Sequence, residues 1–198
     1  MPVTRKASIS RRTKETSIRV EVDLDGTGAA DIRTGIGFFD HMLEQIARHG
    51  RIDLCVQADG DLHVDGHHTV EDCGIVLGNA IAKAVGDKKG INRYGYFVLP
   101  MDEALIVCAV DLCGRPYYSS DVVFQCEKMG DMDTQLVKEF FYSVSYAAGM
   151  NLHFKMLAGA NDHHICEAMF KAFGKALDMA VSYEPRCKDV PSTKGALE

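Results

Sequence analysis

The sequence predicts an α+β fold made by internal duplication of two halves, each of them a β-sheet packed against two helices. Strand-like alternation and the three- and four-residue spacing of amphipathic helices follow one another in the same order in both parts of the chain. A His-His-x-x-Glu motif also occurs twice, starting at His67 and at His163, an offset of 96 residues in a chain of 198. We therefore place the two halves at residues 1–90 and 91–198.

The first half begins with alternating side chains, among which Ile18, Val20 and Val22 share one face of a strand. Apolar residues then recur at helical spacing and stop at Gly50, a residue type that often ends helices. The predicted elements are a strand pair over 4–24 with a turn near 13–14, a helix over 38–50, a strand over 52–56, a turn at 59–61 and a helix over 67–85.

The second half repeats this order. The predicted elements are strands around 93–99, 103–112 and 116–124, a loop at 130–133, a helix over about 133–148, a strand over 151–157, a long helix over about 163–181 and an irregular tail over 185–198.

Composition excludes several classes of function. Lys and Arg number 22 against 28 for Asp and Glu, and the net charge of −6 comes without a dense basic stripe, so nucleic acid is not expected as a partner.

The N-terminus lacks the apolar segment of a signal peptide, and no stretch approaches the roughly 20 apolar residues that span a bilayer. We expect a cytoplasmic protein without a membrane partner, although a removed transit peptide would leave no trace. Seven cysteines without a C-x-x-C pair predict buried thiols in a reducing compartment.

The duplicated motifs, HHTVE at 67–71 and HHICE at 163–167, have the spacing of metal ligands. At a helix start, a glutamate four residues after the first histidine and three after the second can reach the same helix end. Adjacent histidines diverge by about 100°, so each pair can serve two different ions. Imidazole and carboxylate without thiolate favour Mn, Fe or Zn. One such motif alone is explained almost as well by surface histidines, but two in register favour a binuclear site.

Six strings, spread between residues 38 and 195, extend beyond these motifs. They are FFDHM (38–42), GHHTVED (66–72), INRYG (91–95), MDEALIVCAVDLCGRPYY (101–118), NDHHICEAMFKAFGKAL (161–177) and PSTKG (191–195). Together they resemble the imidazoleglycerol-phosphate dehydratase family. The resemblance implies two ribosomal-S5-domain-2-like halves, two Mn ions per active site, a small phosphorylated imidazole as substrate, and a homo-oligomer of 24 subunits with active sites between them.

Seven metal-ligand positions of the family match this chain, namely His41, His67, His68, Glu71, His163, His164 and Glu167. The eighth position departs from the pattern, because many members have a histidine where this chain has Glu139. Glu139 lies 98 residues after His41, so the two are near equivalents in the duplication and each could complete the ligand set of its half. Glutamate can ligate Mn, and we expect the site to persist.

The resemblance also implies the substrate and catalytic residues. Substrate contacts fall on Gln45, Arg93, Arg115, Lys171, Ser192, Thr193 and Lys194. A phosphate group needs cations or backbone N–H donors to bind it. Without the resemblance, Arg93 and Arg115 would be interpreted as members of surface ion pairs, and Lys194 as part of a frayed C-terminal tail. Glu15 matches an acid/base carboxylate. His49 matches a substrate-side position, although it also suits a helix C-terminus interacting with the dipole.

The implied reaction removes water across C2 and C3 of imidazoleglycerol phosphate and gives imidazole acetol phosphate, a step of histidine biosynthesis. The C2 proton is not acidic, and two metals that bind the ring nitrogens would stabilise an imidazolate as electrostatic template and charge sink. Two alternatives stay open. One is a binuclear hydrolase acting on a small phosphorylated substrate. The other is a metal-storing or RNA-binding module, because a fold does not fix a function.

Overall fold

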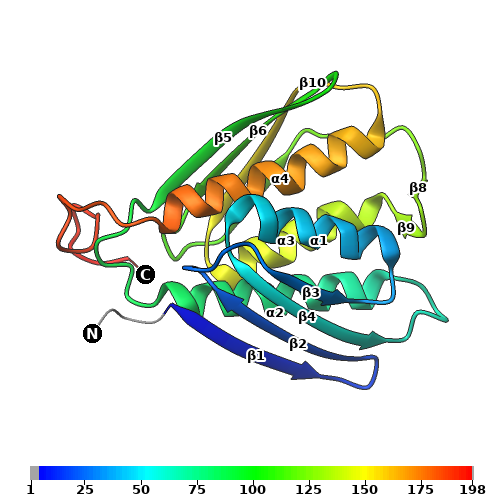
Figure 1. Cartoon of the computed structure of the whole chain (residues 1–198), viewed down its shortest axis with the longest axis horizontal. Coiled ribbons are helices and arrows are strands. Elements are labelled where there is room, and N and C mark those ends of the chain that lie inside the picture. The colour runs from blue at the N-terminus through cyan, green and yellow to red at the C-terminus, as the bar shows by residue number, and fades with distance from the viewer. Residues whose placement is uncertain (1–4, 198) are drawn as a thin grey trace.

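Four helices lie between two β-sheets in the structure, a computed structural model that describes residues 5–197 (Figure 1). The first sheet consists, in spatial order, of β1 (Lys6–Arg12), β2 (Thr16–Asp23), β4 (Asp53–Gly60) and β3 (Ala30–Arg33). The second consists of β5 (Tyr94–Met101), β6 (Ala104–Asp111), β10 (Asn151–Ala158) and β7 (Tyr117–Ser120). The helices are α1 (Gly37–Gly50), α2 (His67–Val85), α3 (Gln135–Ala148) and α4 (Asp162–Val181), and β8 (Lys128–Met129) and β9 (Met132–Asp133) form a small hairpin.

Both sheets have the same topology. In each, an antiparallel hairpin is followed by a third antiparallel strand, which in turn pairs in parallel with a short edge strand. This arrangement confirms the α+β fold and the similarity of the two halves that the sequence predicts.

The helices connect the halves through one continuous hydrophobic core. Helix α1 packs against α4, and α2 packs against α3, so each half pairs its helices with those of the other half. In both helix pairs a glycine lies against the backbone of the neighbouring helix. A Cβ atom added to Gly174 would lie 2.9 Å from the carbonyl oxygen of Ile46, and a Cβ atom added to Gly78 would lie 2.6 Å from the carbonyl oxygen of Val144. Only glycine allows these backbones to approach so closely. Side chains from different halves therefore meet at the helix ends.

All four predicted helices are confirmed within one or two residues. The sequence pattern does not predict β3, because its four residues carry little apolar alternation and none is fully buried. The turn expected at 59–61 is wrong in part, since β4 continues to Gly60, where it pairs with Thr16.

Two further predictions need correction in the second half. The strand expected at 116–124 is limited to Tyr117–Ser120, because only this segment pairs with β10. The segment 130–133, expected as a loop, lies in the β8–β9 hairpin, whose two-residue strands are too short to give a periodic pattern.

The cysteines follow the prediction in part. All seven are free, and Cys73, Cys108, Cys113 and Cys166 are buried, whereas Cys126 is exposed. Burial raises the pKa of the Cys73, Cys108 and Cys166 thiols. Within residues 5–197, no helix combines the length and the apolar content that a bilayer crossing requires.

The second half caps the first helix of the first half. The residue at the N-cap position of α1 is Ile36, which offers no side-chain acceptor, and instead Asp131 accepts hydrogen bonds from the backbone N–H groups of Gly37 (3.0 Å) and Phe38 (3.3 Å). Burial by itself would raise the pKa of Asp131, but these two hydrogen bonds outweigh it and the pKa is lowered.

We expect Asp131→Ala to lower the free energy of unfolding by about 1 kcal/mol, the usual value of a helix cap. Because the folded pKa is below the unfolded value of about 3.9, this contribution is fully present above that pH and disappears as the pH falls through the folded pKa. Urea denaturation of Asp131→Ala and of the exposed control Asp31→Ala, at pH 7 and near pH 3, measures both effects. Equal losses in the two variants at pH 7 would contradict the capping role.

Candidate active site

One cluster of histidine and glutamate side chains joins the two halves. The Oε2 atom of Glu167 lies 3.1 Å from Nε2 of His41 and 3.1 Å from Nε2 of His163. The Glu167 side chain is 9% exposed, whereas those of His41 and His163 are 43% and 48% exposed. A buried carboxylate thus lies beneath two imidazoles that solvent and ligands can reach.

Local sequence explains how α4 presents two of these side chains. The Asn161 side chain caps α4 by accepting hydrogen bonds from the backbone N–H groups of His163 and His164. His163 therefore lies in the first turn, and Glu167 follows it at the i+4 position on the same face. His41 reaches them from the first turns of α1, because α1 packs along α4.

These three residues fit a divalent cation. Their ligand atoms all lie within 4.8 Å of one another, and among the residues that the structure describes no other group of three His, Cys, Asp or Glu does so. Ligands about 2.1 Å from an octahedral ion lie about 3 Å apart at right angles, close to the observed 3.1 Å. Cys166, inside the same motif, is buried with its sulfur 3.7 Å from Met42 Sδ and is turned away from this cluster.

The charges around Glu167 keep it ionised. Burial by itself would raise the pKa of Glu167, but hydrogen bonds from Lys171 and His41 lower it. Lys171 Nζ forms an ion pair with Glu167 Oε1. The structure therefore places Lys171 beside the His/Glu cluster, away from the other cations of the predicted substrate site. Burial, together with the positive charges of Lys171 and Lys175, lowers the pKa of His49, which favours the neutral imidazole.

The corresponding residues of the first half are His67, Glu71 and Glu139. His67 Nε2 lies 4.0 Å from Glu71 Oε2 on α2, the same i+4 relation as that of His163 and Glu167. Glu139 lies on α3, at the point that corresponds to His41 on α1, and it is partly exposed. Because α2–α3 packing repeats α1–α4 packing, Glu139 has the place on α3 that His41 has on α1. The ligand atoms of His67, Glu71 and Glu139 do not all lie within 4.8 Å of one another in the structure.

The second histidine of each motif faces a different carboxylate. His68 Nδ1 lies 3.0 Å from Asp61 Oδ2, and His164 Nδ1 lies 2.8 Å from Glu103 Oε2. The hydrogen bond to His164 lowers the pKa of Glu103 to about 2, and the carboxylates raise the pKa of both histidines. Neither Asp61 nor Glu103 is among the site residues that the sequence predicts. Glu103 could have been found as the counterpart of Glu15 in the duplication, whereas Asp61 has no such signal.

Glu15 lies in the exposed turn between β1 and β2. The Thr13 hydroxyl shapes this turn by accepting hydrogen bonds from the backbone N–H groups of Glu15 and Thr16. Asp72, directly after the first motif on α2, accepts a hydrogen bond from the Thr16 hydroxyl and fixes the hairpin against the helix. The negative charge of Glu15 contributes to the raised pKa of His68, so this carboxylate lies near the first motif.

The remaining predicted substrate residues form two groups. Gln45 lies one turn after His41 on α1, with its Nε2 atom 3.3 Å from the His41 carbonyl oxygen. The other group lines a cavity of about 280 Å³ at the opposite end of the molecule and comprises Arg93, Arg115, Ser192, Thr193 and Lys194.

Arg93 is largely engaged within the chain. Its Nε and Nη2 atoms donate to the two carboxylate oxygens of Asp111 at 2.7 and 3.0 Å, and Nη1 donates to the Pro191 carbonyl oxygen at 2.9 Å. Arg93 therefore holds the C-terminal tail beside the cavity, while Arg115 and Lys194 are exposed there. Asp111 is a further residue that the sequence analysis missed.

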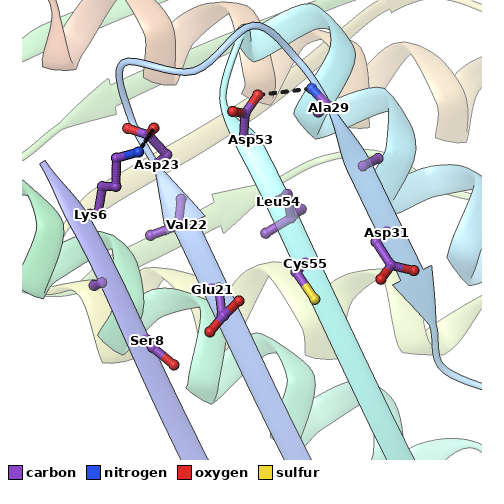
Figure 2. A pocket seen from close by; sticks show the side chains of 12 residues that line it. Lys6, Ser8, Glu21, Val22, Asp23, Ala29, Asp31, Asp53, Leu54 and Cys55 are labelled. Atoms are coloured by element: carbon purple, nitrogen blue, oxygen red, sulfur yellow. Dashed lines mark hydrogen bonds and ion pairs between the residues drawn. The ribbon is translucent and has the colours of Figure 1, made fainter.

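A larger cavity, of about 540 Å³, lies on the outer face of the first sheet, away from all the predicted site residues (Figure 2). Its acidic side chains already have partners: Asp23 pairs with Lys6, and Asp53 accepts hydrogen bonds from the backbone N–H groups of the loop ending at Ala29. The His/Glu cluster remains the better candidate for chemistry.

The duplicated fold and the His/Glu cluster define a duplicated α+β enzyme with a site suited to a divalent cation. The profile of the imidazoleglycerol-phosphate dehydratase family matches residues 34–177. The chain is 61% identical to the enzyme of this name from Lachnoclostridium phytofermentans over 98% of this chain and 99% of the relative, and 56% identical to that from Cereibacter sphaeroides over 98% and 100%.

Two solved structures of the same enzyme agree with the fold. The Staphylococcus aureus structure has a TM-score of 0.82 and 37% identity, covering 90% of this chain and 99% of that chain. The Pyrococcus furiosus structure, in complex with (S)-C348, has a TM-score of 0.83 and 36% identity, covering 96% and 100%. The chain belongs to the imidazoleglycerol-phosphate dehydratase family and is a hydro-lyase of histidine biosynthesis. The resemblance seen in the sequence is confirmed, and the hydrolase alternative is not favoured.

Proposed function

We propose that each active site of this dehydratase combines the His/Glu end of one subunit with the cationic end of another. The observation that carries this proposal is the separation of the two groups along α4. Glu167 lies near the N-terminal end of α4, whereas the backbone N–H of Arg93 binds the carbonyl of Ala180 near its C-terminal end. Ala180 is thirteen residues after Glu167 on the helix, which corresponds to about 20 Å. In Figure 1 the first turns of α2 and α4 lie at one end of the molecule and the C-terminal tail at the other.

Imidazoleglycerol phosphate is too short to bridge this gap. Only the three carbons of the glycerol arm separate its imidazole ring from its phosphate. The ring and the phosphate must therefore bind to groups from different chains, which requires a homo-oligomer. Closed symmetry satisfies this requirement for every subunit, and we propose the 24-subunit assembly that the resemblance implies.

At the His/Glu end, we propose two divalent ions, foremost Mn, as cofactors. His41, His163 and Glu167 would hold one ion, and Glu139, His67 and Glu71 would hold the other, with His68 and His164 offering further imidazoles to ions shared with neighbouring subunits. When bound, the ions supply positive charge that stabilises negative charge on the imidazole ring of the substrate.

The protein side chains perform the remaining tasks. Glu15 is exposed near His68, and its carboxylate can accept the C2 proton or donate a proton to the leaving hydroxyl. Arg115 and Lys194 bind the phosphate through charge-assisted hydrogen bonds, and Arg93 orients the tail that carries Lys194. Seven free thiols suit a reducing compartment, and we propose a cytoplasmic location.

Subunit complementation tests the shared site. Glu167→Gln removes the His/Glu end and the double variant Arg115→Met/Lys194→Met removes the cationic end, so each homo-oligomer should fail to convert imidazoleglycerol phosphate to imidazole acetol phosphate. When the two variants are co-expressed in equal amounts, random assembly gives about a quarter of the sites both intact ends. We expect about a quarter of the wild-type turnover.

Co-expression of Glu167→Gln with His163→Ala is the matched control, because both changes affect the same end and no site can be complete. Light scattering checks that every mixture assembles. If the first mixture stays as inactive as the control while both assemble, each site lies within one chain and the proposal is wrong.

A further inference from the structure

The β1–β2 and β5–β6 hairpins occupy equivalent places in the two sheets, and a glutamate ends the turn of each. Glu15 directly precedes β2, and Glu103, which lies 88 residues later, directly precedes β6. Each of the two glutamates also lies near the second histidine of a His-His motif, His68 and His164 respectively. Glu103 is therefore the counterpart of the proposed acid/base residue.

The two counterparts differ in what their carboxylates contact. Glu103 Oε2 accepts a hydrogen bond from His164 Nδ1 at 2.8 Å. Its other oxygen, Oε1, accepts hydrogen bonds from the backbone N–H groups of Asn161 (2.7 Å) and Ala160 (3.3 Å). Both oxygens are thus engaged, and they tie the β5–β6 turn to the first turn of α4.

In the first half, a different residue contacts the histidine. Asp61, just after β4, places its Oδ2 and Oδ1 atoms 3.0 and 3.2 Å from His68 Nδ1. The backbone N–H of Asp61 donates to the carbonyl oxygen of Glu15 at 3.1 Å, so Asp61 is fixed to the same hairpin turn. Among the residues that the structure describes, the Glu15 carboxylate forms no hydrogen bond or ion pair, and Glu15 is exposed.

We infer that Asp61 and Glu103 are positioning residues that hold His68 and His164 with the proton on Nδ1 and the lone pair on Nε2. A histidine that binds a cation through one ring nitrogen usually donates the other N–H to a carboxylate, which sets the tautomer and the ring orientation. Because Asp61 takes this contact in the first half, the Glu15 carboxylate remains free for proton transfer. The inference rests on the proposed function, in which both histidines offer an imidazole to a divalent ion.

Removal of either carboxylate should weaken Mn binding without destroying the chemistry. We expect Glu103→Ala and Asp61→Ala to raise the Kd for Mn by about 10- to 100-fold, as is usual when a partner of a metal ligand is lost. Glu103→Gln keeps a carbonyl acceptor and should lie between Glu103→Ala and the wild type. Turnover of all three should recover substantially at saturating Mn. The Kd is measured on the assembled protein from the electron paramagnetic resonance signal of free Mn.

Two carboxylates that do not contact the histidines provide matched controls. Asp178 lies in the last turn of α4, the helix that begins near His164, so Asp178→Asn should leave the Kd unchanged. Asp59→Asn is the corresponding control for Asp61, and Asp59 is exposed on β4. Thermal melting confirms that each variant folds.

An unchanged Kd in Glu103→Ala and Asp61→Ala, in protein that otherwise binds Mn, would overturn the positioning role. If an alanine variant does not fold, Glu103→Gln and Asp61→Asn decide instead, and a wild-type Kd in both would have the same consequence. Failure of the wild type to bind Mn would instead refute the proposed metal site, so the two failures are distinguishable.

Discussion

Glu167→Gln is expected to abolish turnover, with a loss in kcat/KM of about 10³-fold or more. The carboxylate lies 3.1 Å from Nε2 of both His41 and His163, and an amide at this place loses the negative charge and can turn a donor toward them. A bound metal ion contributes several kcal/mol to a reaction, and each 1.36 kcal/mol is a factor of ten in rate. Metal analysis by mass spectrometry should show about one ion fewer per subunit than in the wild type.

The matched control is Asp178→Asn, a carboxylate on the same helix in its last turn, far from the cluster. It should retain the wild-type activity and metal content. Glu167 is buried and forms an ion pair with Lys171, so Glu167→Gln leaves the Lys171 charge unpaired and should lower the melting temperature. The apolar core is unchanged, and we expect the variant to fold. Full metal occupancy and normal activity in this variant would refute the role of the cluster.

Glu15→Gln should lower kcat by about 10²-fold while KM and the Kd for Mn change little. The substitution preserves the shape of the side chain and removes its basicity, and a positioned acid or base typically contributes 10²- to 10⁴-fold in rate. A group that acts mainly in the transition state affects kcat more than substrate binding. Steady-state kinetics at saturating Mn, with metal content measured in the same samples, provides the test.

Glu21→Gln is the control for this experiment, because Glu21 lies on the following strand, β2, and contacts Arg19 rather than a His-His motif. The two carboxylate variants near the histidines should also behave differently from each other: a Glu103→Ala enzyme recovers at high Mn, whereas Glu15→Gln does not. Nearly normal kcat in Glu15→Gln would assign the proton transfer to another group, for which His49 and Asp102 are the next candidates.

Local patterns in the sequence were sufficient to predict the four helices, the duplication and the family. Helices α2 and α4 could be located because their apolar residues recur at helical spacing and because the His-His motifs begin them. The family assignment rests on strings of neighbouring residues, which need no knowledge of distant contacts. The same information failed for β3 and for the β8–β9 hairpin, which are too short and too exposed to show a period.

Only the tertiary structure decided which of the predicted residues meet. His41 and Glu167 are 126 positions apart and come together because α1 packs on α4 of the other half rather than on α2 of its own. Lys171 joins this cluster, and Arg93 is bound by Asp111 at the far end of α4. Such contacts depend on how glycine-lined helices pack and on which hairpin turns lie beside them, and these are properties of the assembled core. Sequence spacing thus determined the kinds of side chain available for catalysis, and long-range packing determined which of them share a site.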